Sequence, residues 1–153
     1  MLIQLAVGAS LIVATVLIHS FCLTRLIILL VNYGPTMQIP LPQNWSSLML
    51  AMTVLGIFFA HIVEIWVWAV VYLLTNEVHT FESAIYMSTV TFTTLGFGDI
   101  IFSEKWRLLS SIEGANGMLL FGWSTAFIFE VMRRVWPSRP QEAGSPTVHP
   151  LNS

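Results

Sequence analysis

Three long runs of predominantly apolar residues constrain what this chain can fold into more than any other feature of its sequence. Each run approaches or exceeds about 20 residues, the length that an α-helix needs to cross the hydrocarbon core of a bilayer. The chain has 153 residues, of which 56% are hydrophobic and only 9% are charged. This composition is typical of proteins that are embedded in lipid. The sequence therefore predicts an all-α membrane protein with three transmembrane helices.

The apolar runs divide the chain into four parts. Residues 1–31 form an N-terminal transmembrane helix, and residues 32–46 contain Gly34 and three prolines, which predict a linker. Residues 47–136 form one module, in which helices over 47–75 and 107–135 flank a more polar segment. The remainder, 137–153, begins with a proline that ends the last helix, and its composition predicts a disordered tail.

The polar segment between the last two long helices contains its own short helix. Thr80 suits the N-cap position, and Glu82 suits the first turn, where the positive end of the helix dipole favours an acid. Residues 81–92 then predict a helix that is shorter than the ~20 residues needed to span a bilayer. We expect its C-terminal end, which carries partial negative charge, to point into the membrane.

A nine-residue motif follows directly, because residues 91–99 read Thr-Phe-Thr-Thr-Leu-Gly-Phe-Gly-Asp. Gly96 and Gly98 can adopt positive φ without a steric penalty, so this backbone can alternate between left- and right-handed conformations. Such alternation aims consecutive carbonyl oxygens at one axis, where they can replace the hydration shell of a cation. Non-helical backbone at membrane depth is tolerated only where it lines water or is buried in protein. The motif therefore predicts an ion-coordinating loop rather than an ordinary glycine-rich turn.

This motif resembles the signature of potassium channel pores, Thr-x-x-Thr-x-Gly-(Tyr/Phe)-Gly-Asp, at every defined position. The resemblance covers residues 47–135 and implies the two-helix pore module of the potassium channel superfamily, with a re-entrant pore helix. Four such modules surround one axis in that family, so a chain with one module implies a homotetramer in the lipid bilayer. The implied selectivity filter consists of Thr94, Leu95, Gly96, Phe97 and Gly98.

The resemblance also assigns roles around the filter. Asp99 corresponds to the outer-mouth acid, whose charge concentrates cations, and Thr91 corresponds to a pore-helix residue that supports the filter. Gly117 resembles the glycine at which inner helices of the family bend, although Gly114 and Gly122 are alternative positions for this hinge. The implied potassium ligands are Thr94, Leu95, Gly96 and Phe97.

Three features depart from the common family pattern. Phe97 lacks the hydroxyl of the usual tyrosine, Tyr86 and Met87 stand where many members have a tryptophan pair, and Val90 stands where some bacterial relatives have a glutamate. We interpret these changes as a loss of tethers that predicts weaker selectivity or ready inactivation. The predicted function is a potassium-selective channel. The alternatives are a weakly selective cation channel, or a non-conducting membrane sensor or accessory subunit that keeps the pore fold.

The orientation of the chain in the membrane follows partly from its charges. Arg133, Arg134 and Arg139 favour a cytoplasmic C-terminus, whereas Lys105 and Arg107 argue for the opposite orientation. Pore loops of the potassium channel superfamily enter from the outer side, so the resemblance implies a cytoplasmic C-terminus. We expect a multi-pass protein of the plasma membrane with its N-terminus outside.

Polar residues also occur within the apolar runs. His61 and Glu64 share one helix face at spacing i, i+3 and have two interpretations, a proton-sensing or divalent-cation site or a hydrogen-bonded pair that fixes packing. We favour packing. Because a carboxylate in a membrane needs a partner, we expect Glu64 to meet His61 or Asn116, and Glu113 to support the back of the short helix.

Other function classes find no support in the sequence. The single cysteine, Cys22, excludes an intrachain disulfide and a cysteine metal cage, and the net charge of -2 comes without a basic run for nucleic acid. No nucleophile–base arrangement or phosphate-binding loop suggests an enzyme. We expect no cofactor, with potassium as the permeant species, and no regularly spaced arginines indicate a voltage sensor.

Overall fold

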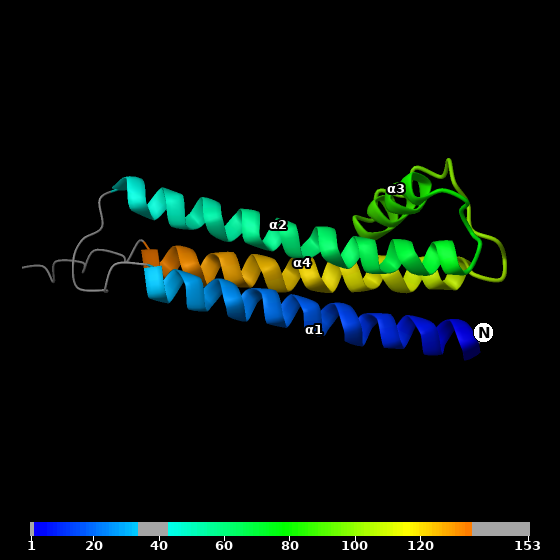
Figure 1. Ribbon diagram of the computed structural model, residues 1–153, viewed down its shortest axis with the longest axis horizontal. Coiled ribbons are helices and arrows are strands. Elements are labelled where there is room, and N and C mark those ends of the chain that lie inside the picture. The colour runs from blue at the N-terminus through cyan, green and yellow to red at the C-terminus, as the bar shows by residue number, and fades with distance from the viewer. Residues whose placement is uncertain (1, 34–42, 136–153) are drawn as a thin grey trace, which may run out of the picture.

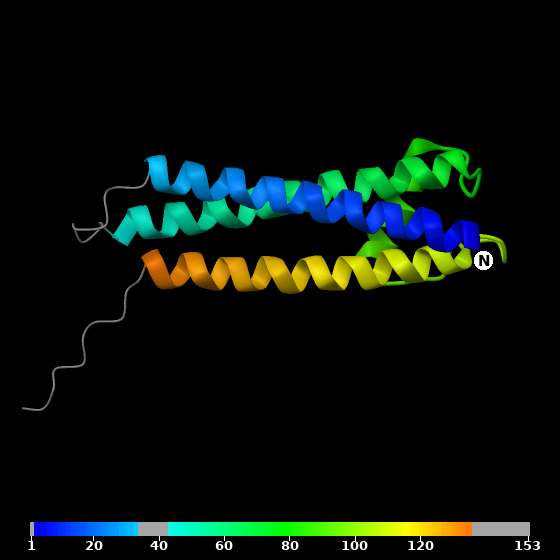
Figure 2. The same cartoon turned by 90° about the horizontal axis from the view of Figure 1, so that it is seen from below.

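The protein is a three-helix bundle with a short fourth helix at one end. The computed structural model describes residues 2–33 and 43–135, which are helical apart from the connections around the short helix. Helices α1, α2 and α4 lie side by side, and α3 packs against α2 and α4 (Figures 1 and 2). The helices are α1 (Leu2–Tyr33), α2 (Gln43–Leu74), α3 (Phe81–Phe92) and α4 (Arg107–Val135).

Helices α1, α2 and α4 are each long and apolar enough to span a membrane, as the sequence predicts. The bounds of α4 and of α3 match the predicted ranges. The predicted linker, 32–46, is too long, since α1 continues to Tyr33 and α2 begins at Gln43. No proline or glycine follows residue 42 until well inside α2, so nothing opposes an earlier helix start. The predicted tail, 137–153, and residues 34–42 lie outside the described residues.

Helix α1 attaches to the bundle along one narrow stripe. Its buried positions recur every three or four residues, so they fall on a single helix face. At Gly8 the helices approach closely, since a Cβ there would lie 2.8 Å from the side chain of Ile112 on α4. The buried stripe consists of Gly8, Leu11, Thr15, His19 and Leu23.

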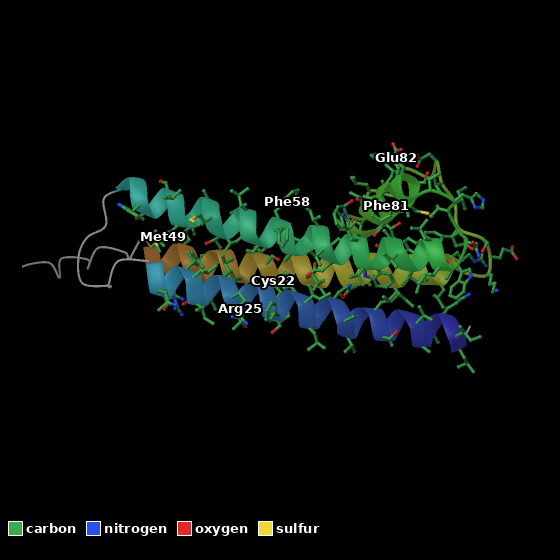
Figure 3. All side chains as sticks on the ribbon, viewed as in Figure 1. Cys22, Arg25, Met49, Phe58, Phe81 and Glu82 are labelled. Atoms are coloured by element: carbon green, nitrogen blue, oxygen red, sulfur yellow. The ribbon has the colours of Figure 1, made fainter. Side chains whose placement is uncertain are left out.

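The remaining faces of the long helices expose apolar side chains, as lipid contact requires. Phe58, on the outward face of α2, is 62% exposed (Figure 3). Cys22 on α1 is half-buried, and the guanidinium of Arg25 lies 4.8 Å from the ring of Phe21. Exposed apolar surface is unfavourable in water but not in hydrocarbon, so this distribution supports a membrane protein.

The hydrophobic core lies where α3 meets α2 and α4. Trp68 and Tyr72 of α2, Phe92 of α3 and Leu120 of α4 are all essentially buried there. Helix α3 begins as predicted, because the Thr80 hydroxyl accepts a hydrogen bond from the Ser83 amide at 3.2 Å. The core thus anchors the short helix firmly to the two long ones.

The two ends of the bundle differ in what they carry. The start of α1 lies at the same end as α3 and the loop that follows it, whereas the ends of α1 and α4 lie at the opposite end (Figure 1). This arrangement agrees with the odd number of predicted spans. It places the first and last residues of α4 on opposite sides of any membrane that the bundle crosses, whereas the start of the 93–106 loop packs against α4 at Gly114, further along the helix.

Candidate functional site

The loop of residues 94–98 has the alternating backbone that its sequence predicts. Gly96 and Gly98 have φ values of +56° and +76°, which confirms the prediction of positive φ at both glycines. Thr94 has a φ of +61°, which the sequence did not signal. A β-branched residue in this region costs about 1–2 kcal/mol, so its surroundings must hold it there. The three positions alternate with Leu95 and Phe97.

The amides of this loop are held by the end of α3. The N–H groups of Leu95 and Gly96 both donate to the carbonyl of Val90, at 2.9 and 3.3 Å. The N–H of Thr94 donates to the carbonyl of Thr91 at 2.9 Å. Thr91 therefore contacts the predicted filter through its backbone. These bonds also occupy carbonyls at the end of α3 that would otherwise lack intrahelical partners.

The carbonyl oxygens of the same loop are free. Within the described part of the chain, no hydrogen bond ends on a carbonyl of residues 94–98. All five residues are exposed, and the large apolar side chains of Leu95 and Phe97 are 59% and 66% exposed. The loop thus has bonded amides at its start, unpaired carbonyls throughout, and apolar side chains without cover inside one chain.

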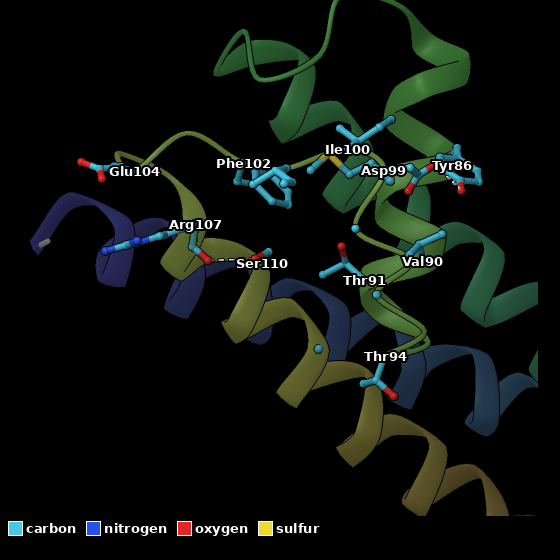
Figure 4. Close-up of a pocket in the computed structure, with 15 residues that line it drawn as sticks. Tyr86, Val90, Thr91, Thr94, Asp99, Ile100, Phe102, Glu104, Arg107 and Ser110 are labelled. Carbon is cyan, nitrogen blue, oxygen red and sulfur yellow. Dashed lines mark hydrogen bonds between the residues drawn. The ribbon is translucent and has the colours of Figure 1, made fainter.

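Asp99 ends the loop and is tied back to α3. The hydroxyl of Tyr86 donates to the Asp99 carboxylate at 2.7 Å (Figure 4). This hydrogen bond, with smaller contributions from the backbone N–H groups of Asp99 and Ile100, lowers the pKa of Asp99 from its ordinary value. The interpretation of Tyr86 as a lost tether was therefore wrong, because its hydroxyl supplies one. The side chains of Phe97 and Val90 are apolar and contribute no such tether, although the backbone carbonyl of Val90 holds the start of the loop.

A cavity of ≈ 550 Å³ lies between α3, the loop and α4. Thr91, Thr94 and Tyr86 line it, as do Asp99 and Gly114 (Figure 4). A Cβ at Gly114 would lie 3.4 Å from the Thr91 carbonyl and 3.7 Å from the Thr94 methyl, so the loop starts directly against α4. The cavity opens beside the exposed part of the loop.

Glu113 supports α3 from behind, as the sequence predicts. Its fully buried carboxylate accepts hydrogen bonds from the Ser88 hydroxyl of α3, at 2.5 Å, and from the Tyr72 hydroxyl of α2. One acid on α4 therefore joins three helices. A buried carboxylate with two strong donors fixes the position of α3 more closely than apolar contact alone.

Gly117 has a packing requirement that is separate from its predicted role as a hinge. A Cβ at this position would lie 2.1 Å from the carbonyl oxygen of Phe92, the last residue of α3. Only glycine lets α4 approach so closely. Gly122, in contrast, has no atom within 4 Å of such a Cβ. Bending at Gly117, Gly114 or Gly122 stays a prediction.

His61 and Glu64 belong to a larger cluster in the middle of the bundle. The two Glu64 oxygens lie 2.8 Å from His61 Nδ1 and 2.8 Å from His19 Nδ1 of α1. Ser124 Oγ of α4 lies 3.0 Å from His61 Nε2 and 3.3 Å from His19 Nε2. The predicted contact of Glu64 with His61 is confirmed, and the interhelical bonds support the packing interpretation.

The alternative partner for Glu64, Asn116, was wrong. The Asn116 amide instead donates to the Thr15 hydroxyl of α1 at 2.8 Å. Sequence analysis also missed His19, the second partner of Glu64. The available signal was its spacing, since Thr15 and His19 are polar residues at i, i+4 in an otherwise apolar run, and intramembrane polar residues need partners.

The comparison with protein families agrees with this geometry. A family model described as ion channel matches residues 58–134, which is half of the chain. The chain belongs to this ion channel family. The matched residues begin within α2, include α3 and the 94–98 loop, and end near the end of α4, so the ion channel match excludes α1. The comparison with curated proteins found no match, and neither did the comparison with solved structures.

Proposed function

We propose that four copies of this chain form a potassium-selective channel in the plasma membrane. The observation that carries the proposal is the 94–98 loop, whose alternating φ values and unpaired carbonyls suit the coordination of dehydrated cations. Ions queue along the carbonyl rings, and repulsion between them drives exit. Conduction is passive and needs no resident cofactor, because potassium itself is the permeant species.

The exposed apolar residues support a homotetramer. Leu95 and Phe97 project from the loop without cover, and the ≈ 550 Å³ cavity opens beside the same loop. Apolar side chains of one chain and an open cavity of the next are complementary features of a repeating interface. Four copies around one axis bury these side chains away from the ion path and bring four sets of carbonyls together.

The remaining elements support conduction indirectly. Helix α3 re-enters the membrane, with the negative end of its dipole toward the ion path. Asp99 faces the outer mouth, where its lowered pKa keeps it charged. Arg133 and Arg134 then lie at the cytoplasmic end of α4, together with the C-terminus. The two long helices of each module, α2 and α4, surround and support the pore.

A second candidate is a weakly selective cation channel. It is favoured by the apolar side chains of Phe97 and Val90, which leave the side chain of Tyr86 to hold the outer end of the loop. The reversal potential in a potassium-to-sodium gradient separates the two candidates. A reversal potential close to the potassium equilibrium value supports selectivity, and a value near zero supports the second candidate.

The direct experiment is potassium flux from liposomes that hold the purified protein. We expect flux from the wild type and none from Gly96→Ala, because alanine opposes the φ of +56° at this position. Phe58→Leu, a change on the outward face of α2, is the matched control and should conduct like the wild type. Absence of flux from folded wild-type tetramers, across pH and voltage, would contradict the proposal and favour a non-conducting sensor or accessory subunit.

A further inference from the structure

A second group of ion-binding side chains lies away from the 94–98 loop, at the middle of the bundle. His19 of α1 and His61 and Glu64 of α2 each offer one ligand atom, and these atoms lie within 4.8 Å of one another. All three side chains are buried, with His19 and Glu64 at 0% exposure and His61 at 7%. Two imidazole nitrogens and a carboxylate oxygen form a ligand set that zinc uses in proteins.

The far sides of both imidazole rings are also held in place. The two rings stack with centroids 5.3 Å apart, so their Nδ1 atoms face Glu64 together and their Nε2 atoms face Ser124 together. A metal-bound histidine donates its other N–H to a second acceptor, which fixes the ring. The Ser124 hydroxyl has two lone pairs and can accept from both Nε2–H groups. The outer support of a metal site is therefore already present.

Metal binding changes the number of protons that the cluster holds. Its four close contacts need four protons, and a neutral set of one carboxylic acid, two imidazoles and one hydroxyl supplies four. A metal ion bound at both Nδ1 atoms leaves three, two on Nε2 and one on the hydroxyl. Metal binding therefore releases one proton and changes the net charge of the cluster from zero to plus one.

The surroundings of the cluster favour a single bound cation. The described ring contacts are all aromatic, since Trp123 packs on His19, and Phe92 and Phe121 pack on His61. Glu113 and Arg107 of α4 are not bonded to it. Phe92 is the last residue of α3, so the negative end of that helix dipole lies nearby and favours positive charge.

We propose that His19, His61 and Glu64 form a site for one zinc-class divalent metal ion that joins α1 to the ion channel module. Coordination requires the three ligand atoms to draw closer together. Ligand atoms that are each about 2.0–2.2 Å from a tetrahedral zinc ion are about 3.3 Å apart, whereas those of His19, His61 and Glu64 lie within 4.8 Å of one another. Glu64 already contacts each Nδ1 atom at 2.8 Å, with one oxygen on His19 and the other on His61. Three protein ligands leave a fourth position for water. The proposal does not rest on conduction, because the site lies within one chain.

The test uses the full chain, reconstituted in lipid nanodiscs after removal of any histidine tag. The chain has four histidines, so the double substitution His79→Ala, His149→Ala leaves His19 and His61 as the only ones. This background protein is stripped with chelator and titrated with Zn²⁺ or Co²⁺ alone. We expect one metal ion per chain, release of one proton per ion, and visible cobalt absorption typical of tetrahedral coordination.

Glu64→Gln in the same background is the decisive variant. A glutamine amide can donate to one Nδ1 and accept from the other, so the hydrogen-bonded ring closes and the fold is kept. A neutral amide is a poor zinc ligand, so we expect at least ~100-fold weaker binding. Ser124→Ala removes only the outer support and should weaken binding by about 10–100-fold. Because metal bound only to the folded state stabilises it, the melting temperature should rise with Zn²⁺ in the background protein and not in Glu64→Gln.

Three results would overturn the proposal. One is the absence of metal binding by the folded background protein, which would mean that the cluster is a hydrogen-bonded group that only supports helix packing. Another is binding that survives both Glu64→Gln and His61→Ala, which would show that the ion binds elsewhere. A cobalt–thiolate absorption band would likewise reject this ligand set, since it would place Cys22 in the site.

Discussion

The 94–98 loop and the cluster around Glu64 differ in whether their polar groups have hydrogen-bond partners within one chain. The loop bonds amides to α3 and leaves carbonyls unpaired and exposed. In the cluster, Glu64 and Ser124 each bridge both His19 and His61 within one buried group. The loop is built from backbone, whereas the cluster is built from side chains.

This difference shows which parts of the protein are complete in one chain. Unpaired carbonyls and uncovered apolar side chains at the loop are unfavourable in a single chain within a membrane. This agrees with our proposal that ions and further copies of the chain complete the loop. The cluster needs neither to hold α1 against α2 and α4. We expect the loop region to respond most to changes of backbone and close packing, and the bundle to respond to loss of individual side-chain partners.

Gly117→Ala should give the largest effect, because it breaks the close contact that positions α3 beneath the loop. The new Cβ would lie 2.1 Å from a backbone carbonyl, which cannot move without shifting α3. We expect a loss of about 3 kcal/mol of stability, at the upper end of overpacking costs. Denaturation in detergent would measure it. Gly122→Ala is the control, because a Cβ at this position of the same helix would meet open space. Equal losses of stability in the two variants would contradict the packing argument.

Glu113→Leu should give the next largest effect, since it tests the side-chain support that joins α3 to the bundle. Removal of the carboxylate leaves the buried hydroxyls of Ser88 and Tyr72 without this acceptor. We expect a loss of about 2 kcal/mol. Glu113→Gln keeps one acceptor oxygen and should lose less in the same denaturation experiment. If both variants are as stable as the wild type, the Glu113 carboxylate does not help to hold α3, and its attachment rests on apolar packing and on the 2.9 Å hydrogen bond from the Ser88 hydroxyl to the Ile65 carbonyl.

Asn116→Leu should have a smaller effect, confined to the attachment of α1. It removes the bond to Thr15, and interhelical hydrogen bonds in membranes contribute about 0.6 kcal/mol on average. A double-mutant cycle with Thr15→Val would measure the coupling between the two residues. Additive losses would show that this bond contributes nothing, and would leave the cluster around Glu64 as the polar link to α1.

Tyr86→Phe should give the smallest effect, a shift in the titration of Asp99. The hydrogen bond from Tyr86 lowers the pKa of Asp99 from its ordinary value, so its removal should raise that pKa. Because the pKa of Asp99 is lower in the folded state than in the unfolded state, its ionised carboxyl stabilises the fold at pH values above the ordinary pKa. This stabilisation is lost as the pH falls through the lowered pKa of the folded state. NMR titration of the Asp99 carboxyl should therefore move to higher pH in the variant. An unchanged titration would mean that the tether is absent in the assembled protein.

Much of the loop region could be predicted from the sequence because its signals are local. Residues 81–92, the Thr80 cap and positive φ at Gly96 and Gly98 all follow from residue types at short spacing. The prediction that Tyr86 is a lost tether was wrong, because its hydroxyl reaches the Asp99 carboxylate and can take the place of another hydrogen-bond donor. That reach depends on how α3 and the loop meet.

The sequence by itself determined that this protein has three membrane-length helices, a short helix and a loop with positive φ at its two glycines, because hydropathy, capping and glycine act over a few residues. Only the tertiary structure decided that His19 meets Glu64, that Asn116 meets Thr15, and that Gly117 must admit the end of α3. The reason is physical. An apolar helix packs through almost any of its faces, so the rotation of α1, which selects these partners, depends on contacts between residues distant in the chain.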